Sequence, residues 1–480
     1  MYMGEKSGIS SDLEQKFEDR RQSGPSGTLV VSDDETYVGD TVTLDGRNLP
    51  ANEPVNLVWH TAVGHWGILK GNEVVGPQYQ HHTRRIRTLS TDENGAFTEE
   101  FEIPEDYGGE HRIQIQTVDE DVLAQETVTV VPWFELEQTS VPLGETFEVT
   151  GYGIGPNYLT NNYQIVWDNT MVGFITGVKN RGTATAEIRA VGPVGDHTIQ
   201  VWRNFHGVPF LQNNTQSPFG PIAGGRQSSW TVEVTERESE LPTSWMDSLA
   251  DEQPLTTHLV KPDVESDAEL DISPNCGQAG TDAFIQGKNF PSETTVNLVW
   301  YTHQGHHIKG TGVSAEPEPD RLPIVTTDEE GKFQTEVTIP SEVGSTRPIT
   351  AEIDGQIVAT TGFMMQPEIK QMSPTEGPVG TDIEFEFRGL GWTMADTAYF
   401  FVYDNTRVGY VCGSDNDEGV VRTHLKAAGE PGTHFIDVYP GFFKMEEEKP
   451  DFTLKPHLSY KDNHALRQLP AFHFTFEVTE

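Results

Sequence analysis

The sequence predicts an all-β fold, built from four tandem antiparallel β-sandwiches in the order A-B-A′-B′. Two different units are each repeated, apolar and polar residues alternate in short segments, and glycines separate those segments. Alternation with a period of two is typical of a strand with one buried face. Such segments recur about every 8 to 12 residues with no long helical period between them, which is the pattern of β-sandwich domains.

The first repeated unit begins near the N-terminus and returns after the middle of the chain. Residues 46–59 and 287–300 both end in the apolar run Val-Asn-Leu-Val-Trp, and residues 91–97 and 327–333 share Thr-Asp-Glu-x-Gly-x-Phe. The second motif predicts a hairpin turn, because Asp opens such turns and Gly takes the left-handed position.

A second unit is repeated in the same way. Its copies match in three ordered blocks, which are residues 166–173 with 402–409, 195–201 with 432–438, and 230–236 with 474–480. All four units share an opening segment with strand alternation, at residues 39–46, 144–151, 280–287 and 380–389. The chain is therefore a two-domain unit that has been duplicated.

The repeats place the domain boundaries. We assign residues 28–132 to A, 133–236 to B, 269–366 to A′ and 367–480 to B′, with an N-terminal tail at 1–27 and a linker at 237–268. Residues 244–247 have capping-box form and predict a helical turn that docks Trp245 on a domain, the alternative being an extended linker. In the tail, Leu13 and Phe17 lie four residues apart, which predicts a short docking helix. The alternative is a disordered tail.

Two of the shared openings resemble a known family. Residues 272–290 and 372–382 each carry Ser-Pro-x-x-Gly followed by Gly-Thr-Asp, and they look like the start of IPT/TIG-type immunoglobulin-like domains. The openings at residues 39 and 144 lack the leading Ser-Pro-x-x-Gly and match less well. The resemblance covers most of residues 28–480. It implies four immunoglobulin-like β-sandwiches with a binding or spacing role, and it supplies no catalytic residues.

The composition excludes several classes of partner. The 480 residues include 74 Asp and Glu against 32 Lys and Arg, a net charge of −42, and this acidity is spread along the whole chain. Nucleic acid and anionic membranes both require a basic surface, so neither is an expected partner. An evenly acidic, lysine-poor folded chain suits concentrated salt, which screens self-repulsion, and favours a haloarchaeon or its virus as the source. The alternative is an ordinary acidic surface protein.

Histidines gather in the two A-type units. The weak candidates for metal ligands are His65, His81, His82, His306 and His307. Imidazole is a common ligand of zinc, copper and nickel, but only His65 and His306 occupy matching places in the two copies. We therefore favour loop histidines at a partner-facing end and expect no metal and no other cofactor.

Basic and aromatic residues supply the candidate interaction sites. Arg84, Arg85 and Arg87 form a dense basic run in a very acidic chain; they contact a partner or pair with nearby acidic strands. The long segment 204–226 carries Phe205, Phe210 and Phe219, which either anchor a partner or cover the edge of a sandwich. The Asp-Asn-Thr triplets at Asp168 and Asp404 predict turns, and Cys276 and Cys412 are expected to be free thiols.

No pattern typical of a catalytic site is present, and we expect the chain not to be an enzyme. The expected function is a structural or interaction protein that spaces and presents binding loops on a cell surface or in an assembly, with a protein partner or as a homo-oligomer. The alternatives are an accessory, non-catalytic subunit of an exported redox enzyme and a virion turret, fibre or decoration protein. We expect an extracellular or cell-surface location, the alternative being a virion. Residues 1–27 lack the apolar core of a signal peptide, which leaves three explanations: assembly in the cytoplasm, for example into a virion, export with a signal-bearing partner, or a precursor that starts upstream.

Overall fold

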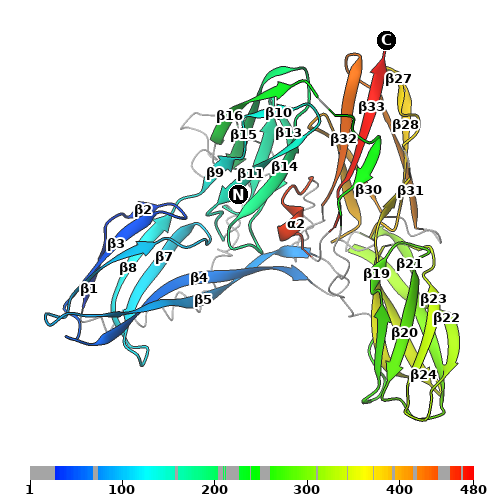
Figure 1. Ribbon diagram of the computed structural model, residues 1–480, viewed down its shortest axis with the longest axis horizontal. Coiled ribbons are helices and arrows are strands. Elements are labelled where there is room, and N and C mark those ends of the chain that lie inside the picture. The colour runs from blue at the N-terminus through cyan, green and yellow to red at the C-terminus, as the bar shows by residue number, and fades with distance from the viewer. Residues whose placement is uncertain are drawn as a thin grey trace. The chain divides into compact units, whose positions relative to one another are not determined.

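The computed structural model confirms the predicted all-β, immunoglobulin-like sandwich class (Figure 1). It describes residues 27–68, 74–156, 160–203, 209, 211, 226–237, 239–248, 260–309, 312–342, 344–370, 372–391, 395–413, 419–441, 455–465 and 469–480, with the backbone alone for residues 68, 75, 303–309 and 312–318. No helix among these residues is long and apolar enough to cross a membrane. The chain falls into two compact units, Met1–Gly67 with Gly76–Glu238, and Ile68–Val75 with Ser239–Glu480.

Sandwich A packs a three-stranded sheet on a five-stranded one. The first sheet has the order β1 (Thr28–Val31), β3 (Thr41–Arg47), β6 (Phe97–Glu102); the second has the order β2 (Glu35–Thr36), β8 (Val122–Val130), β7 (Gly109–Gln116), β4 (Pro54–Ile68), β5 (Val74–Ser90). Alternate residues of β3 point inward, so that Val42 and Leu44 join Trp59 and Ile113 in the core. The predicted alternation therefore builds this core.

Sandwich B has the same plan. Its sheets have the orders β14 (Ala184–Arg189), β11 (Thr146–Tyr152), β9 (Trp133–Leu136) and β10 (Ser140–Pro142), β16 (Arg226–Thr235), β15 (Gly195–Arg203), β12 (Tyr163–Trp167), β13 (Thr170–Ile175). All five residues of β12 are buried, as is expected of a central strand covered on both faces.

Sandwich A′ repeats A in the second half of the chain. Its sheets have the orders β18 (Glu269–Ser273), β20 (Asp282–Lys288), β23 (Phe333–Thr338) and β19 (Cys276–Gly277), β25 (Gln356–Met365), β24 (Ser345–Ile353), β21 (Thr295–Lys309), β22 (Gly312–Thr326). The core contains Ile285, Leu298, Trp300 and Phe363. Trp300 is buried at the position that Trp59 holds in A, which the repeated Val-Asn-Leu-Val-Trp motif predicts.

Sandwich B′ repeats B with two additions. Its sheets have the orders β26 (Glu368–Ile369), β28 (Asp382–Arg388), β31 (Val420–Lys426) and β17 (Ser244–Met246), β33 (Phe472–Thr479), β32 (Gly432–Pro440), β29 (Ala398–Tyr403), β30 (Thr406–Cys412), with β27 (Glu376–Pro378) also paired to β33. The additions are β17, which comes from the predicted linker, and the short helix α2 (Tyr460–Asn463), which comes from the long connection between β32 and β33. The domain boundaries given above stay predictions.

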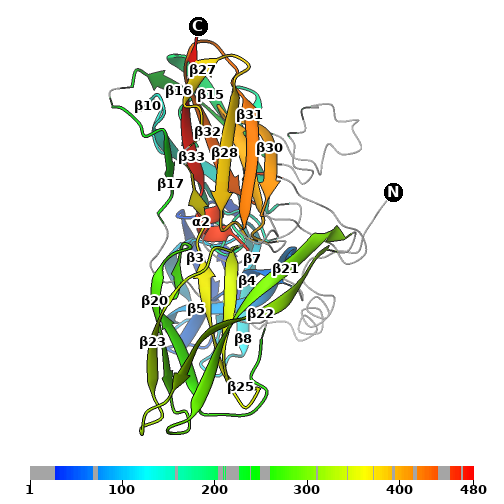
Figure 2. The same cartoon turned by 90° about the vertical axis from the view of Figure 1, so that its right-hand side faces the viewer.

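The A-type sandwiches each carry a long hairpin that continues past its own sheet. In A′, β21 pairs with β24 only from Asn297 to Trp300, whereas it pairs with β22 as far as Lys309 (Figure 2). In A, β4 pairs with β7 only from Asn56 to Trp59 and then runs on to Ile68 beside β5 (Figure 1). We call residues 60–68 with 74–85 the A ribbon, and residues 301–309 with 312–321 the A′ ribbon.

Candidate functional site: two ribbons and their buried supports

The base of the A ribbon rests on a buried acid. The Trp59 indole Nε1 donates to Asp106 Oδ2 at 2.8 Å, and the Thr61 hydroxyl donates to Asp106 Oδ1 at 2.5 Å. His111 stacks on Trp59 with ring centroids 4.5 Å apart, and its two ring nitrogens lie 2.9 Å from His60 O and 2.6 Å from Tyr107 O. Both ring nitrogens of His111 are therefore held by backbone carbonyls next to the acid that supports the ribbon.

The A′ ribbon has the same support with different side chains. Glu342 replaces Asp106 and Arg347 replaces His111 beside Trp300. Arg347 is fully buried, its Nε lies 3.6 Å from Glu342 Oε2, and its Nη2 donates to Gly344 O at 2.9 Å. Burial raises the pKa of Glu342 above its usual value although Arg347 opposes this. Both copies therefore hold a buried acid and a basic group next to the tryptophan at which the ribbon leaves the sheet.

Tyr107 ties the A ribbon to sandwich B. Its hydroxyl donates to Val178 O of sandwich B at 2.6 Å and accepts from Gly64 N in the ribbon at 3.0 Å. A side chain at Gly64 has no room, because a Cβ there would lie 2.3 Å from Val178 O. Tyr79 from β5 packs edge-on against Tyr107 with centroids 5.3 Å apart. Burial raises the pKa of Tyr107 to about 12, so the hydroxyl keeps its proton at neutral pH.

Replacing Tyr107 by Phe should loosen the A ribbon. The change leaves two backbone groups without their partner in a buried seam, which costs about 1–3 kcal/mol. Hydrogen exchange measured at the Gly64 amide should become faster, whereas the exchange of the β3 amides should not change. Tyr152→Phe in β11 is the matched control, because it removes a hydroxyl from sandwich B without touching the ribbon. Unchanged exchange at Gly64 in the Tyr107 variant would contradict the tie.

The predicted metal candidates lie on the ribbons, but they form cross-strand pairs. His65 Nε2 lies 3.2 Å from Gln78 Oε1, and the His60 and His81 rings are joined Nδ1 to Nε2 at 3.0 Å. His82 is exposed. In the described part of the chain no three His, Cys, Asp or Glu side chains gather closely enough to hold a metal ion. The side chains of His306 and His307 lie outside the described residues.

The candidate interaction residues are distributed over several places. Arg84, Arg85 and Arg87 are all on β5; Arg85 is exposed, Arg84 is half-buried, and Arg87 pairs with Glu99 of β6 at 2.9 Å. Trp245 lies in β17 and stacks on His473 with centroids 5.2 Å apart. Leu13, Phe17, Phe205, Phe210 and Phe219 lie outside the described residues.

The predicted helical turn at residues 244–247 is wrong, because Ser244–Met246 form an edge strand antiparallel to β33. Backbone pairing with a neighbouring strand outweighs the local capping preference.

The segment after β17 is held by a buried polar cluster, which we call the clamp. His473 Nδ1 lies 2.6 Å from Asp437 Oδ1, and His473 Nε2 lies 3.2 Å from Asp247 Oδ1. Asp247 also accepts from the Tyr460 hydroxyl, and from Ala471 N at 3.2 Å. Burial alone would raise the pKa of Asp247, but the hydrogen bonds from His473, Tyr460 and Ala471 outweigh it and lower the pKa to about 2. The partners of Asp247 all lie more than 200 positions away along the chain, so sequence spacing gave no sign of these contacts.

The two Asp-Asn-Thr triplets are turns, as predicted, and each is fixed by a histidine. Asp168 and Asn169 have φ of 43° and 65°, and Asp404 and Asn405 have φ of 42° and 58°, which is the left-handed pair of a tight hairpin. His197 and His434 lie 2.5 Å from the two aspartates through Nδ1. The histidines were not predicted, although both fall in the matched blocks at residues 195–201 and 432–438.

The turn in B′ should make stability depend on pH. The hydrogen bond to Asp404 raises the pKa of His434 above its usual 6.5, against the effect of burial. A raised folded-state pKa adds stability that is complete below pH 6.5 and is lost as the pH rises through the raised value. The β29–β30 amides, followed by hydrogen exchange corrected for intrinsic rates, should therefore lose protection above neutral pH. His434→Gln should flatten that dependence, and an equally steep profile in the variant would exclude this cause.

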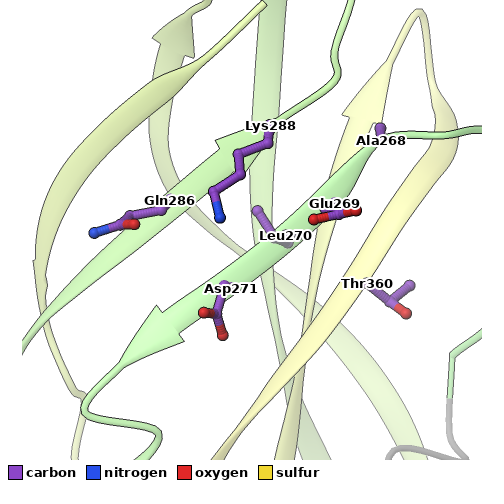
Figure 3. Close-up of a pocket in the computed structure, with 7 residues that line it drawn as sticks. All are labelled: Ala268, Glu269, Leu270, Asp271, Gln286, Lys288 and Thr360. Atoms are coloured by element: carbon purple, nitrogen blue, oxygen red, sulfur yellow. The ribbon is translucent and has the colours of Figure 1, made fainter.

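The surface depressions that we find are open and polar. One of about 400 Å³ is lined by Glu269 and Asp271 from β18, by Gln286 and Lys288 from β20, and by Thr360 (Figure 3). A second of about 390 Å³ lies over β28 and β31 and includes Glu386, Arg422 and His424. Glu386 there accepts from Arg388 and Arg422 at the protein surface.

Both cysteines are free thiols, as predicted. Cys276 is buried in sandwich A′ and Cys412 is half-buried in B′. Burial raises the pKa of Cys412 to about 11, so this thiol is a poor nucleophile at neutral pH.

Comparison with known proteins shows no family. No protein-family model matches the chain, and no curated protein resembles it in sequence. Among solved structures, the native E. coli alpha-2-macroglobulin is similar with 9% identity and a TM-score of 0.17 over 93% of this chain and 30% of that one. Salmonella alpha-2-macroglobulin reacted with methylamine is similar with 9% identity and a TM-score of 0.18. The match covers 95% of this chain and 31% of that one. The chain thus spans about a third of the length of these proteins, and the likeness concerns the fold alone.

Proposed function

We propose that this chain is a non-catalytic structural and interaction protein that presents its A and A′ ribbons to a protein partner. The observation that carries the proposal is the pair of hairpins that leave their sheets at Trp59 and Trp300. The outer strands of the ribbons, β5 and β22, are each the last strand of their sheet, and an edge strand offers unpaired backbone groups to a partner. Duplication then supplies two contact elements in one chain.

The buried polar groups support a scaffold rather than an enzyme. Asp106, Glu342 and Asp437 are each engaged by neighbouring side chains beneath the surface, where they hold ribbon, seam and linker in place. Their positions suit fixed geometry. We further propose that the protein works outside the cell or at its surface in concentrated salt, which fits its evenly spread acidic charge.

Shortening both ribbons tests the proposal. Residues 66–77, beyond the His65–Gln78 pair, and residues 304–316, inside the His303–Pro317 pair, would each be replaced by Asn-Gly, which closes a tight hairpin. The complex would be isolated natively in high salt from the source organism and identified by mass spectrometry. The shortened protein should lose the partner that the full chain retains, and hydrogen exchange in β3 and β20 should report that the sandwiches stay folded.

The matched control changes the other end of the same strands. Asn94→Ser and Glu330→Ser alter exposed residues of the hairpin turns that follow β5 and β22, so they should leave the complex intact. A partner retained by the doubly shortened protein would refute the proposal, as would a monomer without any partner for the full chain.

A further inference from the structure

The two ribbons differ in the strand that forms their outer edge. Strands β5 and β22 are each the last strand of a five-stranded sheet, with β4 and β21 as their neighbours among the described strands. The repeated Thr-Asp-Glu turns, beginning at Thr91 and Thr327, fix the correspondence between these two edge strands. Thr83 in β5 then corresponds to Pro319 in β22, and Arg84 corresponds to Asp320.

Prolines block the edge of β22. Pro317 and Pro319 pair with His303 and Tyr301 of β21, two residues apart, so their nitrogens point to the same side of the strand. A proline inside a ladder is tolerated where the missing N–H would face away from the neighbouring strand. The outward side of β22 therefore lacks N–H donors at these two positions, which is a common protection of an edge against further pairing.

The edge of β5 is built for the opposite purpose. At the position of Pro319 it has Thr83. We infer from the repeated sequence that β5 keeps the register of β22, which turns the Thr83 N–H outward. Arg84 and Arg85 follow Thr83, whereas β22 has Asp320 at the position of Arg84 and Arg321 at the position of Arg85. Arg87, farther along, already pairs with Glu99 of β6, so the open stretch lies on its N-terminal side. Cationic side chains on both faces of an edge strand suit an incoming strand with acidic side chains.

We propose that the β5 edge of the A ribbon binds an extended acidic segment of a partner protein by strand addition, and that the A′ ribbon excludes it. The backbone of the added strand pairs with β5, and its carboxylates lie beside Arg84 and Arg85. This inference rests on the proposed function, because it names the chemistry by which one ribbon recognises its partner. It also explains why the duplicated ribbons do not carry the same edge.

The test uses a synthetic peptide and the full chain. A fluorescein-labelled ten-residue peptide of alternating Glu and Val would be titrated and followed by anisotropy, with hydrogen exchange mapped on β5 and β22. We expect one peptide per chain and slower exchange in β5 alone. The peptide with Lys in place of Glu should not bind. The acidic peptide with alternate N-methyl groups should bind about 30-fold more weakly, if two lost backbone hydrogen bonds cost about 1 kcal/mol each.

Variants of the protein complete the test. Thr83→Pro should weaken binding and Thr83→Ala should not, because only the proline removes the N–H. Arg84→Asp should weaken binding most at low salt. The triple change Pro317→His, Pro319→Thr and Asp320→Arg should open β22 and raise the stoichiometry from one to two, which is informative even if Thr83→Pro unfolds the ribbon.

The outcomes separate this inference from the proposed function. Equal binding of the Lys and Glu peptides, protection outside β5, or no effect of N-methylation would overturn strand addition at this edge. If the peptide fails in this way while the doubly shortened protein still loses its partner, ribbon presentation stands and the edge pairing is wrong. Shortening leaves Thr83, Arg84 and Arg85 in place. If the peptide binds as expected and shortening removes no partner, the edge pairing stands, and the far ends of the ribbons are not what the partner contacts.

Discussion

Replacing Arg347 by Met should destabilise sandwich A′ by about 3–5 kcal/mol, because it leaves the buried Glu342 carboxylate without its cation. Arg347 is fully buried, and the two groups lie 3.6 Å apart at the point where the A′ ribbon leaves its sheet. Since a chain of several sandwiches does not unfold in one step, the effect is best measured by hydrogen exchange in β20 and β24. We expect those two strands to lose protection together.

The destabilisation should shrink in acid. The pKa of Glu342 is already raised by burial, and without Arg347 it must rise further. A carboxyl whose folded-state pKa is raised adds stability below its unfolded pKa and loses it as pH rises through the folded value. The variant should therefore be closer to the parent at pH 5 than at pH 8. A pH-independent loss would mean that packing, and not the orphaned charge, causes it.

Two further variants isolate the buried pair. Combining Arg347→Met with Glu342→Leu removes both charges and should recover most of the loss, since apolar replacement of a whole buried pair is often neutral. Arg388→Met breaks a surface pair with Glu386, at 3.1 Å, and should cost at most about 1 kcal/mol. If the double variant were no more stable than the single one, the proposed ion pair would not be the support of the ribbon.

Replacing His473 by Ala should release the linker from sandwich B′ and cost about 3–5 kcal/mol there. The imidazole stands between Asp437 and Asp247, and its loss leaves two carboxylates together in a poorly hydrated place. The amides of β17 should then exchange much faster, and protease should cut the chain between residues 239 and 248. His424→Ala, which changes an exposed histidine of β31, is the control and should have neither effect.

Acid should weaken the same clamp by protonating Asp247. Asp247 has its pKa lowered from 3.8 to about 2, which corresponds to roughly 2 kcal/mol of stability. That stability is complete above pH 3.8 and is lost as the pH falls towards 2. Asp247→Asn should make β17 exchange quickly at neutral pH and remove this acid dependence. If β17 stayed protected in both variants, the strand pairing alone would hold the linker.

Much of the fold could be predicted because its signals are local. Alternation of apolar and polar residues between glycines predicted strands such as β3 and β20, and the Asp-Glu-x-Gly motif predicted the turns after β5 and β22. The prediction of secondary structure failed where contacts with distant parts of the chain determine the local conformation. Residues 60–68 read as loop because their polar side chains break the apolar alternation, yet cross-strand pairing makes them a ribbon. Similarly, Ser244–Met246 became a strand because β33 offered an edge.

The candidate site was less predictable for the same reason. Arg84 and Arg85 stood out by charge against an acidic background, and β5 does place them on an edge strand. Tyr107, Asp106 and Arg347 gave no signal, since a single buried tyrosine or ion pair has no periodicity and no motif. Comparing the two copies position by position would have shown that Asp106 and His111 become Glu342 and Arg347, an acid and a base in both.

The clamp has a consequence for the order in which the chain is made. Asp247 precedes sandwich A′, but its partner His473 lies 226 residues later, near the C-terminus. On the ribosome, the linker must therefore wait until the last strand has been synthesised before it can dock, while A, B and A′ have already had time to fold. Docking of the linker therefore requires β33, and a protein truncated before this strand would leave residues 239–248 open to proteases.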